Sequence, residues 1–139
     1  MKLLFKKVIK RATIFRIREI IEGYHSLAVF EGRYYVALRD GRIAGCVSLV
    51  ERGWYMTEIK HLFVKEEYRA SGVGRFLLEE ALKKVFTPLV CCTVRSDNKR
   101  SADLFLKNSF DIMGTFRNSM TDREIFLMVR NLQQKKVSQ

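Results

Sequence analysis

A stretch from residue 58 to residue 78, EIKHLFVKEEYRASGVGRFLL, holds the residues with the clearest chemical use. An apolar run ends at Val64, a polar loop follows, and a turn containing Gly72 and Gly74 opens a helical pattern. Backbone N–H groups at a helix start lack intrahelical partners and carry partial positive charge. Glycine lets an anion approach these groups closely. We therefore expect the turn from Arg69 to Arg75 to hold a pyrophosphate, with both arginines adding charge-assisted bonds.

Two familiar phosphate loops do not fit this turn. A dinucleotide-binding turn needs a third glycine or alanine where Leu77 stands, and the G-K-[ST] ending of a P-loop is missing. The turn instead reads R-x-x-G-x-G, from Arg69 to Gly74. It resembles the coenzyme A loop of the GNAT superfamily of N-acetyltransferases.

Other segments resemble the same family, in the same order. Leu62-Phe63-Val64 is similar to its fourth strand. The run from Val94 to Asn98, followed by Ala102, Leu104, Phe105 and Phe110, is similar to its fifth strand and following helix. Ile9 to Thr13 is similar to the start of many members. The resemblance covers nearly the whole chain.

The resemblance implies acetyl-coenzyme A as cofactor, with its thioester arm between splayed fourth and fifth strands. Strand backbone groups would pair with the pantetheine amides as an added strand does. Asn98 matches a position that contacts the cofactor arm, and asparagine is also a good helix cap. The cofactor-binding residues implied are Leu62, Phe63, Val64, Arg69, Ala70, Ser71, Gly72, Val73, Gly74, Arg75, Asn98 and Phe105.

The catalytic residues depart from two family patterns. Phe105 stands where many members carry a tyrosine acid, and Thr93 stands where some carry a glutamate. Another branch has its glutamate on the fourth strand, and Glu58 fits that spacing. A lysine amine, with a pKa of about 10.4, is protonated at pH 7 and needs a base. Glu58 is our candidate base; the alternative is an ordinary exposed strand carboxylate.

His61 is the other titratable group near this site. Strict alternation would place it on the strand face opposite Glu58. The family's fourth strand carries a bulge here, which would change that placement. Its role therefore stays open between chemistry and packing.

The surrounding elements alternate in type. The strands expected are 5–10, 33–38, 42–50, 54–64, 89–94, 110–116 and 124–129, and the helices are 13–23, 72–86 and 98–108. Thr13 is the expected cap of the first helix, and Asp40-Gly41 predicts a hairpin turn. The fold class is α/β (α+β), a single GNAT-like domain over 1–132. We expect a mixed, mostly antiparallel sheet of about six to seven strands, helices on both faces and splayed central strands, with a polar tail over 133–139.

Composition narrows the class of protein. The chain has 139 residues and a net charge of +11, of which +7 lies in its first 18 residues. That basic segment can attract phosphate-rich partners or simply keep the surface solvated. Cys46, Cys91 and Cys92 form no metal-binding spacing and are expected to be buried thiols. No apolar run approaches the roughly 18 residues of a membrane span, so we expect a soluble, cytoplasmic protein without a metal or a membrane partner.

Two functions follow from these patterns. The first is an N-acetyltransferase that moves an acetyl group from acetyl-coenzyme A to a primary amine by direct attack in a ternary complex. Its acceptor would be an amine-bearing small molecule or protein, acidic if the basic segment guides it. The alternative is a non-catalytic GNAT-like module that binds coenzyme A, or a nucleic-acid or ribonucleoprotein partner, through its basic face. A monomer and a homodimer both stay open.

Overall fold

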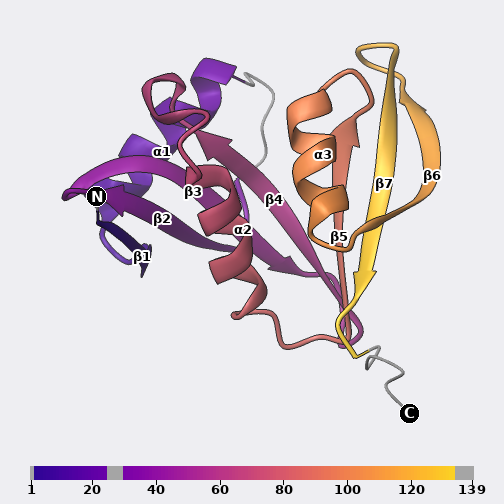
Figure 1. Cartoon of the computed structure of the whole chain (residues 1–139), viewed down its shortest axis with the longest axis horizontal. Helices are drawn as coiled ribbons and strands as arrows, with labels where there is room; N and C mark the ends of the chain where they lie inside the picture. The colour runs from indigo at the N-terminus through magenta and orange to yellow at the C-terminus, as the bar shows by residue number, and fades with distance from the viewer. Residues whose placement is uncertain (1, 25–29, 134–139) are drawn as a thin grey trace. The chain divides into compact units, whose positions relative to one another are not determined.

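The structure is a computed structural model that describes residues 2–24 and 30–133 (Figure 1). Its contacts group into two compact units. Unit 1 comprises Met1–Val50 and Ile59–Val85, and unit 2 comprises Glu51–Glu58 and Phe86–Gln139. Within the described ranges the chain forms seven strands and three α-helices. Among the same residues, no helix is both long enough and apolar enough to cross a bilayer.

Unit 1 contains strands in the order β1-β2-β3-β4. These are β1 (Leu3–Lys7), β2 (Arg33–Arg39), β3 (Arg42–Glu51) and β4 (Met56–Val64), of which β4 belongs to unit 1 from Ile59 onward. β1 and β3 both pair antiparallel with β2. Asp40 and Gly41 join β2 to β3, and their φ angles of 51° and 83° are those of a type I′ hairpin turn. The predicted hairpin is therefore confirmed.

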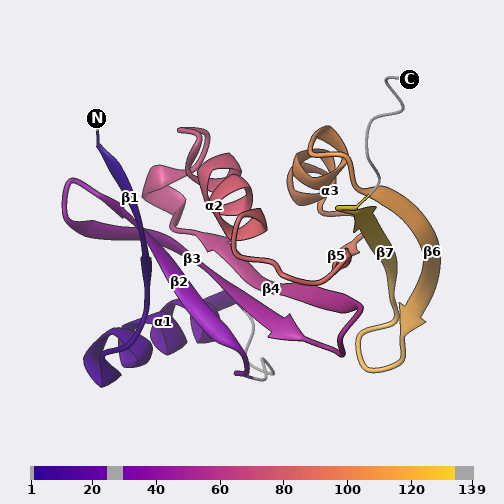
Figure 2. The same ribbon diagram turned by 90° about the horizontal axis from the view of Figure 1, so that it is seen from below.

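Two helices cover opposite faces of the unit 1 sheet (Figure 2). α1 (Arg11–Tyr24) buries Ile17 and Ile21 against Val36 of β2 and Cys46 of β3. α2 (Val73–Leu82) lies on the other face, where the ring of Phe76 meets that of Phe5 at 6.3 Å between centroids. Neighbouring strand residues point to opposite faces, so the sheet presents one apolar set to each helix.

Gly45 lets β3 approach the end of β4 closely. A Cβ atom at this position would lie 2.4 Å from the carbonyl oxygen of Phe63 and 3.0 Å from Cδ1 of Leu77. The N–H of Lys65 donates to the carbonyl of Ala44 at 2.8 Å, directly after β4 ends. The absence of a side chain at Gly45 therefore lets the end of β4 lie close to β3, and the backbone hydrogen bond from Lys65 to Ala44 holds it there.

Unit 2 contains strands in the order β4-β5-β7-β6. It comprises the start of β4, β5 (Leu89–Arg95), α3 (Lys99–Lys107), β6 (Asp111–Asn118) and β7 (Arg123–Asn131). β4 and β5 run parallel over three residue pairs, Met56–Glu58 with Leu89–Cys91, and the other pairs are antiparallel. The buried hydroxyls of Thr57 and Thr87 meet at 2.7 Å beside this ladder.

The three cysteines are free and buried, as predicted. Burial raises the pKa of the Cys46 thiol to about 12 and that of Cys91 to about 11. Burial raises the pKa of Cys92 as well. Among the described residues no group of His, Cys, Asp and Glu has the arrangement of a metal site.

The fold class predicted from the sequence is confirmed, whereas several element boundaries differ. α1 begins at Arg11, so Thr13 is not its cap. The carbonyl of Lys10 accepts from the N–H groups of both Thr13 and Ile14, which places the first turn earlier. α2 ends at Leu82, well before Thr87, because Lys84 and Val85 donate to carbonyls three residues back. Residues 134–139 of the predicted tail lie outside the described residues.

Candidate functional site

The turn between β4 and α2 takes a backbone path that favours glycine. After β4, a short 3₁₀ helix, η1 (Glu66–Tyr68), leads into residues 69–72. Ala70 and Gly72 both have left-handed backbones, with φ of 61° and 86°. A left-handed residue costs little only when it is glycine. The turn thereby reverses the chain within a few residues and starts α2 at Val73.

The N-terminus of α2 is open to a ligand. Gly72 is its N-cap residue, and no side chain caps the helix. A Cβ atom at Gly72 would meet nothing within 4 Å, so the space on that side of Gly72 is open. The N–H groups of the first helical turn have no intrahelical acceptor. This combination would suit a phosphate group, and binding of the pyrophosphate by this turn stays a prediction.

The two arginines of the turn are held by weak contacts. Nε of Arg69 donates to the carbonyl of Val64 at 3.2 Å. Nε of Arg75 lies 3.4 Å from Oε2 of Glu79 one turn along α2, and the Arg75 side chain is 73% exposed. Exposed i,i+4 ion pairs contribute little to stability. The Arg75 guanidinium can therefore turn toward an anion at the helix start at low cost.

The strand before the turn carries an irregularity at His61. His61 has a left-handed φ of 54° within β4, which interrupts the alternation of the strand. Its ring lies against the rings of Phe30, Tyr34 and Phe63, with centroids 5.7, 6.1 and 6.3 Å away. The structure thus gives His61 a packing role among aromatic rings. The sequence did not indicate the contacts with Phe30 and Tyr34, because both residues are distant from His61 in the chain.

Glu58 lies in unit 2, where Arg52 holds it. Nη2 of Arg52 is 2.8 Å from Oε1 of Glu58, and Nε donates to the same oxygen at 2.9 Å. The Glu58 side chain is 19% exposed, so it is more enclosed than an ordinary surface carboxylate. It stands opposite Cys91 in the β4–β5 ladder. Sequence reasoning missed Arg52, which sits in a turn without any distinguishing pattern.

Asn98 and Phe105 also lie in unit 2, at the start and within α3. Oδ1 of Asn98 accepts from the N–H of Ser101 at 3.3 Å, so Asn98 caps the helix. Phe105 is only 3% exposed, and its ring packs edge to face on Phe110 at 5.1 Å. The ring at the position of the family's tyrosine is therefore part of the unit 2 core.

Comparison with known proteins decides the family. The model of the acetyltransferase (GNAT) family matches residues 7–110. The chain belongs to the GNAT acetyltransferase family. An uncharacterized N-acetyltransferase from Chlorobaculum tepidum is 32% identical over 76 residues, which cover 47% of this chain and 49% of that relative. The match thus spans about half the length of the curated relative.

Solved GNAT structures share the fold of this chain. A GNAT acetyltransferase from Elizabethkingia anophelis with acetyl-CoA bound has a TM-score of 0.74 at 19% identity, covering 94% of this chain and 98% of that one. The putative acetyltransferase yncA from Salmonella typhimurium, with its cofactor acetyl-CoA, has a TM-score of 0.77 at 14% identity. The match covers 100% of this chain and 99% of that one. At these identities the likeness concerns the fold.

Unit 1 of this GNAT protein brings together most of the expected cofactor residues. It contains Leu62, Phe63, Val64, Arg69, Ala70, Ser71, Gly72, Val73, Gly74 and Arg75 in one continuous strand–turn–helix segment. The hydroxyl of Ser71 donates to the carbonyl of Tyr68, which closes the turn from inside. Glu58, Asn98 and Phe105 belong to unit 2.

Proposed function

We propose that this GNAT acetyltransferase moves an acetyl group from acetyl-coenzyme A to a primary amine by direct attack in a ternary complex. Membership of the family supports acetyl transfer with acetyl-coenzyme A as cosubstrate. The observation that carries the proposal is the uncapped start of α2 with free space in front of Gly72. The cosubstrate supplies a thioester, whose acetyl carbon accepts a nucleophile.

The turn before α2 would hold the pyrophosphate of the cosubstrate. The first N–H groups of α2 would donate to phosphate oxygens, and the helix dipole adds to this attraction. Arg69 and Arg75 would add charge-assisted bonds after leaving Val64 and Glu79. The backbone of Leu62, Phe63 and Val64 would pair with the amides of the pantetheine arm. In this assignment the residues of unit 1 bind and orient, while they carry out no proton transfer.

Glu58 is the proposed base. An amine attacks a thioester only in its neutral form, and a carboxylate can take its proton directly or through water. Both contacts from Arg52 go to Oε1 of Glu58. Its second oxygen, Oε2, is then the one to accept a proton from the substrate ammonium. Arg52 orients the carboxylate through these two contacts.

A general acid is not required in this scheme. The thiol of an unperturbed cysteine has a pKa of about 8.5, so a comparable thiolate can leave without being protonated first. Phe105, which is buried, therefore lacks the general acid that many family members have at this position, but the reaction can still proceed. We accordingly propose that turnover depends on amine activation rather than on protonation of the leaving group.

The acceptor class is tested by a screen. Purified protein would be incubated with acetyl-coenzyme A and amines of three kinds: polyamines, aminoacyl compounds and peptides with a free N-terminus. Release of free coenzyme A that depends on one class of acceptor supports the enzyme. Tight binding of acetyl-coenzyme A by calorimetry, without release for any amine, would instead favour the non-catalytic module.

A further inference from the structure

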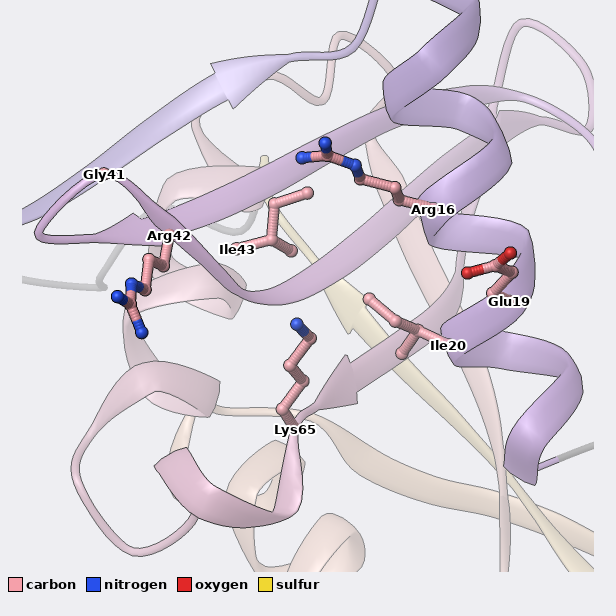
Figure 3. Close-up of a pocket in the computed structure, with 7 residues that line it drawn as sticks. All are labelled: Arg16, Glu19, Ile20, Gly41, Arg42, Ile43 and Lys65. Carbon is pink, nitrogen blue, oxygen red and sulfur yellow. The ribbon is translucent and has the colours of Figure 1, made fainter.

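A second concave site lies in unit 1, on the α1 side of the sheet (Figure 3). This open cavity has a volume of about 480 Å³, within the range of small-ligand sites. Three segments distant in the sequence form it: α1, the β2–β3 hairpin and the residue after β4. Its lining residues are Arg16, Glu19, Ile20, Gly41, Arg42, Ile43 and Lys65. No residue of the turn from Arg69 to Arg75 lines it.

Three cations and one carboxylate, Glu19, line the cavity, and Glu66 and Glu67 line a second hollow that shares Glu19, Ile20 and Lys65 with it. In the part of the chain that the structure describes, Arg16, Arg42 and Lys65 form no ion pair within 4.0 Å. A fourth cation, Arg39, is the register partner of Arg42 across the hairpin turn. Like charges directly opposite one another on two strands repel. An anion beside Arg42 would screen this repulsion, although Arg39 itself does not line the cavity and its guanidinium lies over the ring of Tyr68, 5.6 Å from the centroid.

The cations are presented by rigid elements. Arg16 projects from α1, and Arg42 is the first residue of β3 after the tight Asp40-Gly41 turn. The backbone of Lys65 is held at both groups, because its N–H donates to Ala44 and its carbonyl accepts from Tyr68 at 2.9 Å. Figure 3 shows the Lys65 side chain extending into the space between Ile20 and Ile43. The backbone therefore needs no reordering when a ligand binds, and the ordering cost falls on the side chains.

We propose that this cavity binds a small phosphate monoester distinct from acetyl-coenzyme A. Arg16, Arg42 and Lys65 against Glu19 give the lining a net charge of +2, and a phosphate monoester carries close to −2 at pH 7. Guanidinium groups match the geometry of phosphate oxygens. Ile20 and Ile43 offer apolar contact to the body of the ligand. Glu19 would repel phosphate but accept from a hydroxyl or ammonium group on that body.

The test uses inorganic phosphate and glycerol 3-phosphate as probes, at constant ionic strength, followed by ¹H–¹⁵N NMR of the whole chain. Amides of Gly41, Ile43 and Lys65 report on the cavity, whereas those of Gly72 and Gly74 report on the α2 turn. We expect saturable shifts at the cavity amides, with glycerol 3-phosphate binding more tightly than inorganic phosphate. Shifts confined to the α2 turn, or linear shifts at all exposed cations, would overturn the proposal.

Variants distinguish binding in this cavity from nonspecific attraction of an anion to the basic surface. Arg42→Gln and Lys65→Met should each weaken glycerol 3-phosphate about tenfold, the scale of one lost bond to a charged group. Arg100→Gln removes an exposed cation of α3 and should change nothing. The NMR spectra themselves show whether each variant is folded. Unchanged affinity in both cavity variants would refute the site.

The role of Glu19 has its own test. Glu19→Gln removes the repulsion, so inorganic phosphate should bind more tightly to this variant. The preference for glycerol 3-phosphate should shrink, because an amide accepts a hydrogen bond less strongly than a carboxylate. An unchanged preference for glycerol 3-phosphate over inorganic phosphate would overturn the role of Glu19. Tighter binding of malonate than of glycerol 3-phosphate would overturn the assignment to phosphate.

Discussion

Arg52 contacts a single carboxylate oxygen of Glu58 with two nitrogens, Nη2 at 2.8 Å and Nε at 2.9 Å from Oε1. The N–H of Arg52 also donates to the carbonyl of Met56 at 2.9 Å, so the arginine is fixed at its backbone as well. Partly exposed ion pairs contribute little to folding free energy. The main effect of this pair is therefore to fix the orientation of the Glu58 carboxylate.

Glu58→Gln should lower the turnover number roughly a hundredfold or more, the usual loss when a general base is removed. Glutamine can still accept from Arg52, so the fold and the affinity for acetyl-coenzyme A should not change. The acidic limb of the pH–rate profile should disappear. Asp103→Asn on the exposed side of α3 is a matched control for the loss of one carboxylate. An acidic limb that survives in Glu58→Gln would assign the base to another residue.

Gly72→Glu should abolish binding of acetyl-coenzyme A, because it places bulk and negative charge where the pyrophosphate would lie. Gly72→Ala tests backbone strain alone: a non-glycine residue at φ of 86° costs about 1–2 kcal/mol of stability, yet the Cβ meets no atom. Calorimetry should therefore show binding in the alanine variant and none in the glutamate variant. Equal affinity in a folded Gly72→Glu variant would move the pyrophosphate site elsewhere.

Gly45→Ala should destabilise the protein strongly. The new Cβ would lie 2.4 Å from the carbonyl oxygen of Phe63, and a backbone atom cannot move aside as a flexible side chain can. Overpacking of this kind typically costs about 1–3 kcal/mol, measured here by urea unfolding. At Gly114 a Cβ meets nothing within 4 Å, so Gly114→Ala is the control and should be near neutral. Similar midpoints for the two variants would contradict the close approach of β3 and β4.

A charge reversal tests whether the basic N-terminal segment guides the acceptor. Lys7, Arg11 and Arg18 are all exposed, and Arg18 lies over the ring of Phe30 at 4.6 Å. Changing the three to glutamate should raise KM for an acidic acceptor at low salt, and the effect should fade as salt screens it. Affinity for acetyl-coenzyme A should not change.

The control for this experiment reverses three exposed cations of α3, Lys99, Arg100 and Lys107, which makes the same change in net charge. Identical acceptor kinetics in the two triple variants would mean that only total charge matters. Unaltered kinetics in the N-terminal variant at both low and high salt would leave the segment a purely solvating surface.

Local signals in the sequence predicted much of the fold. Asp40-Gly41 was predictable because a two-residue turn with positive φ at both positions needs such residues. The sequence marked Gly72 and Gly74 for close approach of an anion, whereas in the structure Gly72 also has the positive φ that favours glycine. Thr13 was misleading, because a good capping residue also occurs inside a first turn, and the backbone of Lys10 decides where α1 starts.

Contacts between distant segments were beyond sequence reasoning. The cavity joins residues 16, 42 and 65, and no pattern in any one segment marks it. Arg52 and Glu58 are near in sequence, yet no hydrophobic periodicity or turn motif predicts that the side chain of Arg52 contacts that of Glu58. The aromatic surroundings of His61 include Phe30 and Tyr34, which are distant from it in the sequence.

The state of the three thiols has a practical consequence for enzymology. Only the thiolate attacks a disulfide reagent, and a thiol with a pKa of 11 or 12 is almost wholly protonated at pH 8. Cys46, Cys91 and Cys92 are in addition shielded from reagent by burial. A colorimetric thiol reagent added to the folded protein should thus give a flat baseline, and any colour that develops with substrate reports product. In denaturant the same reagent would react with all three cysteines. The fraction of thiols that react before denaturant is added therefore measures the unfolded fraction of the protein in the same sample that is assayed for activity.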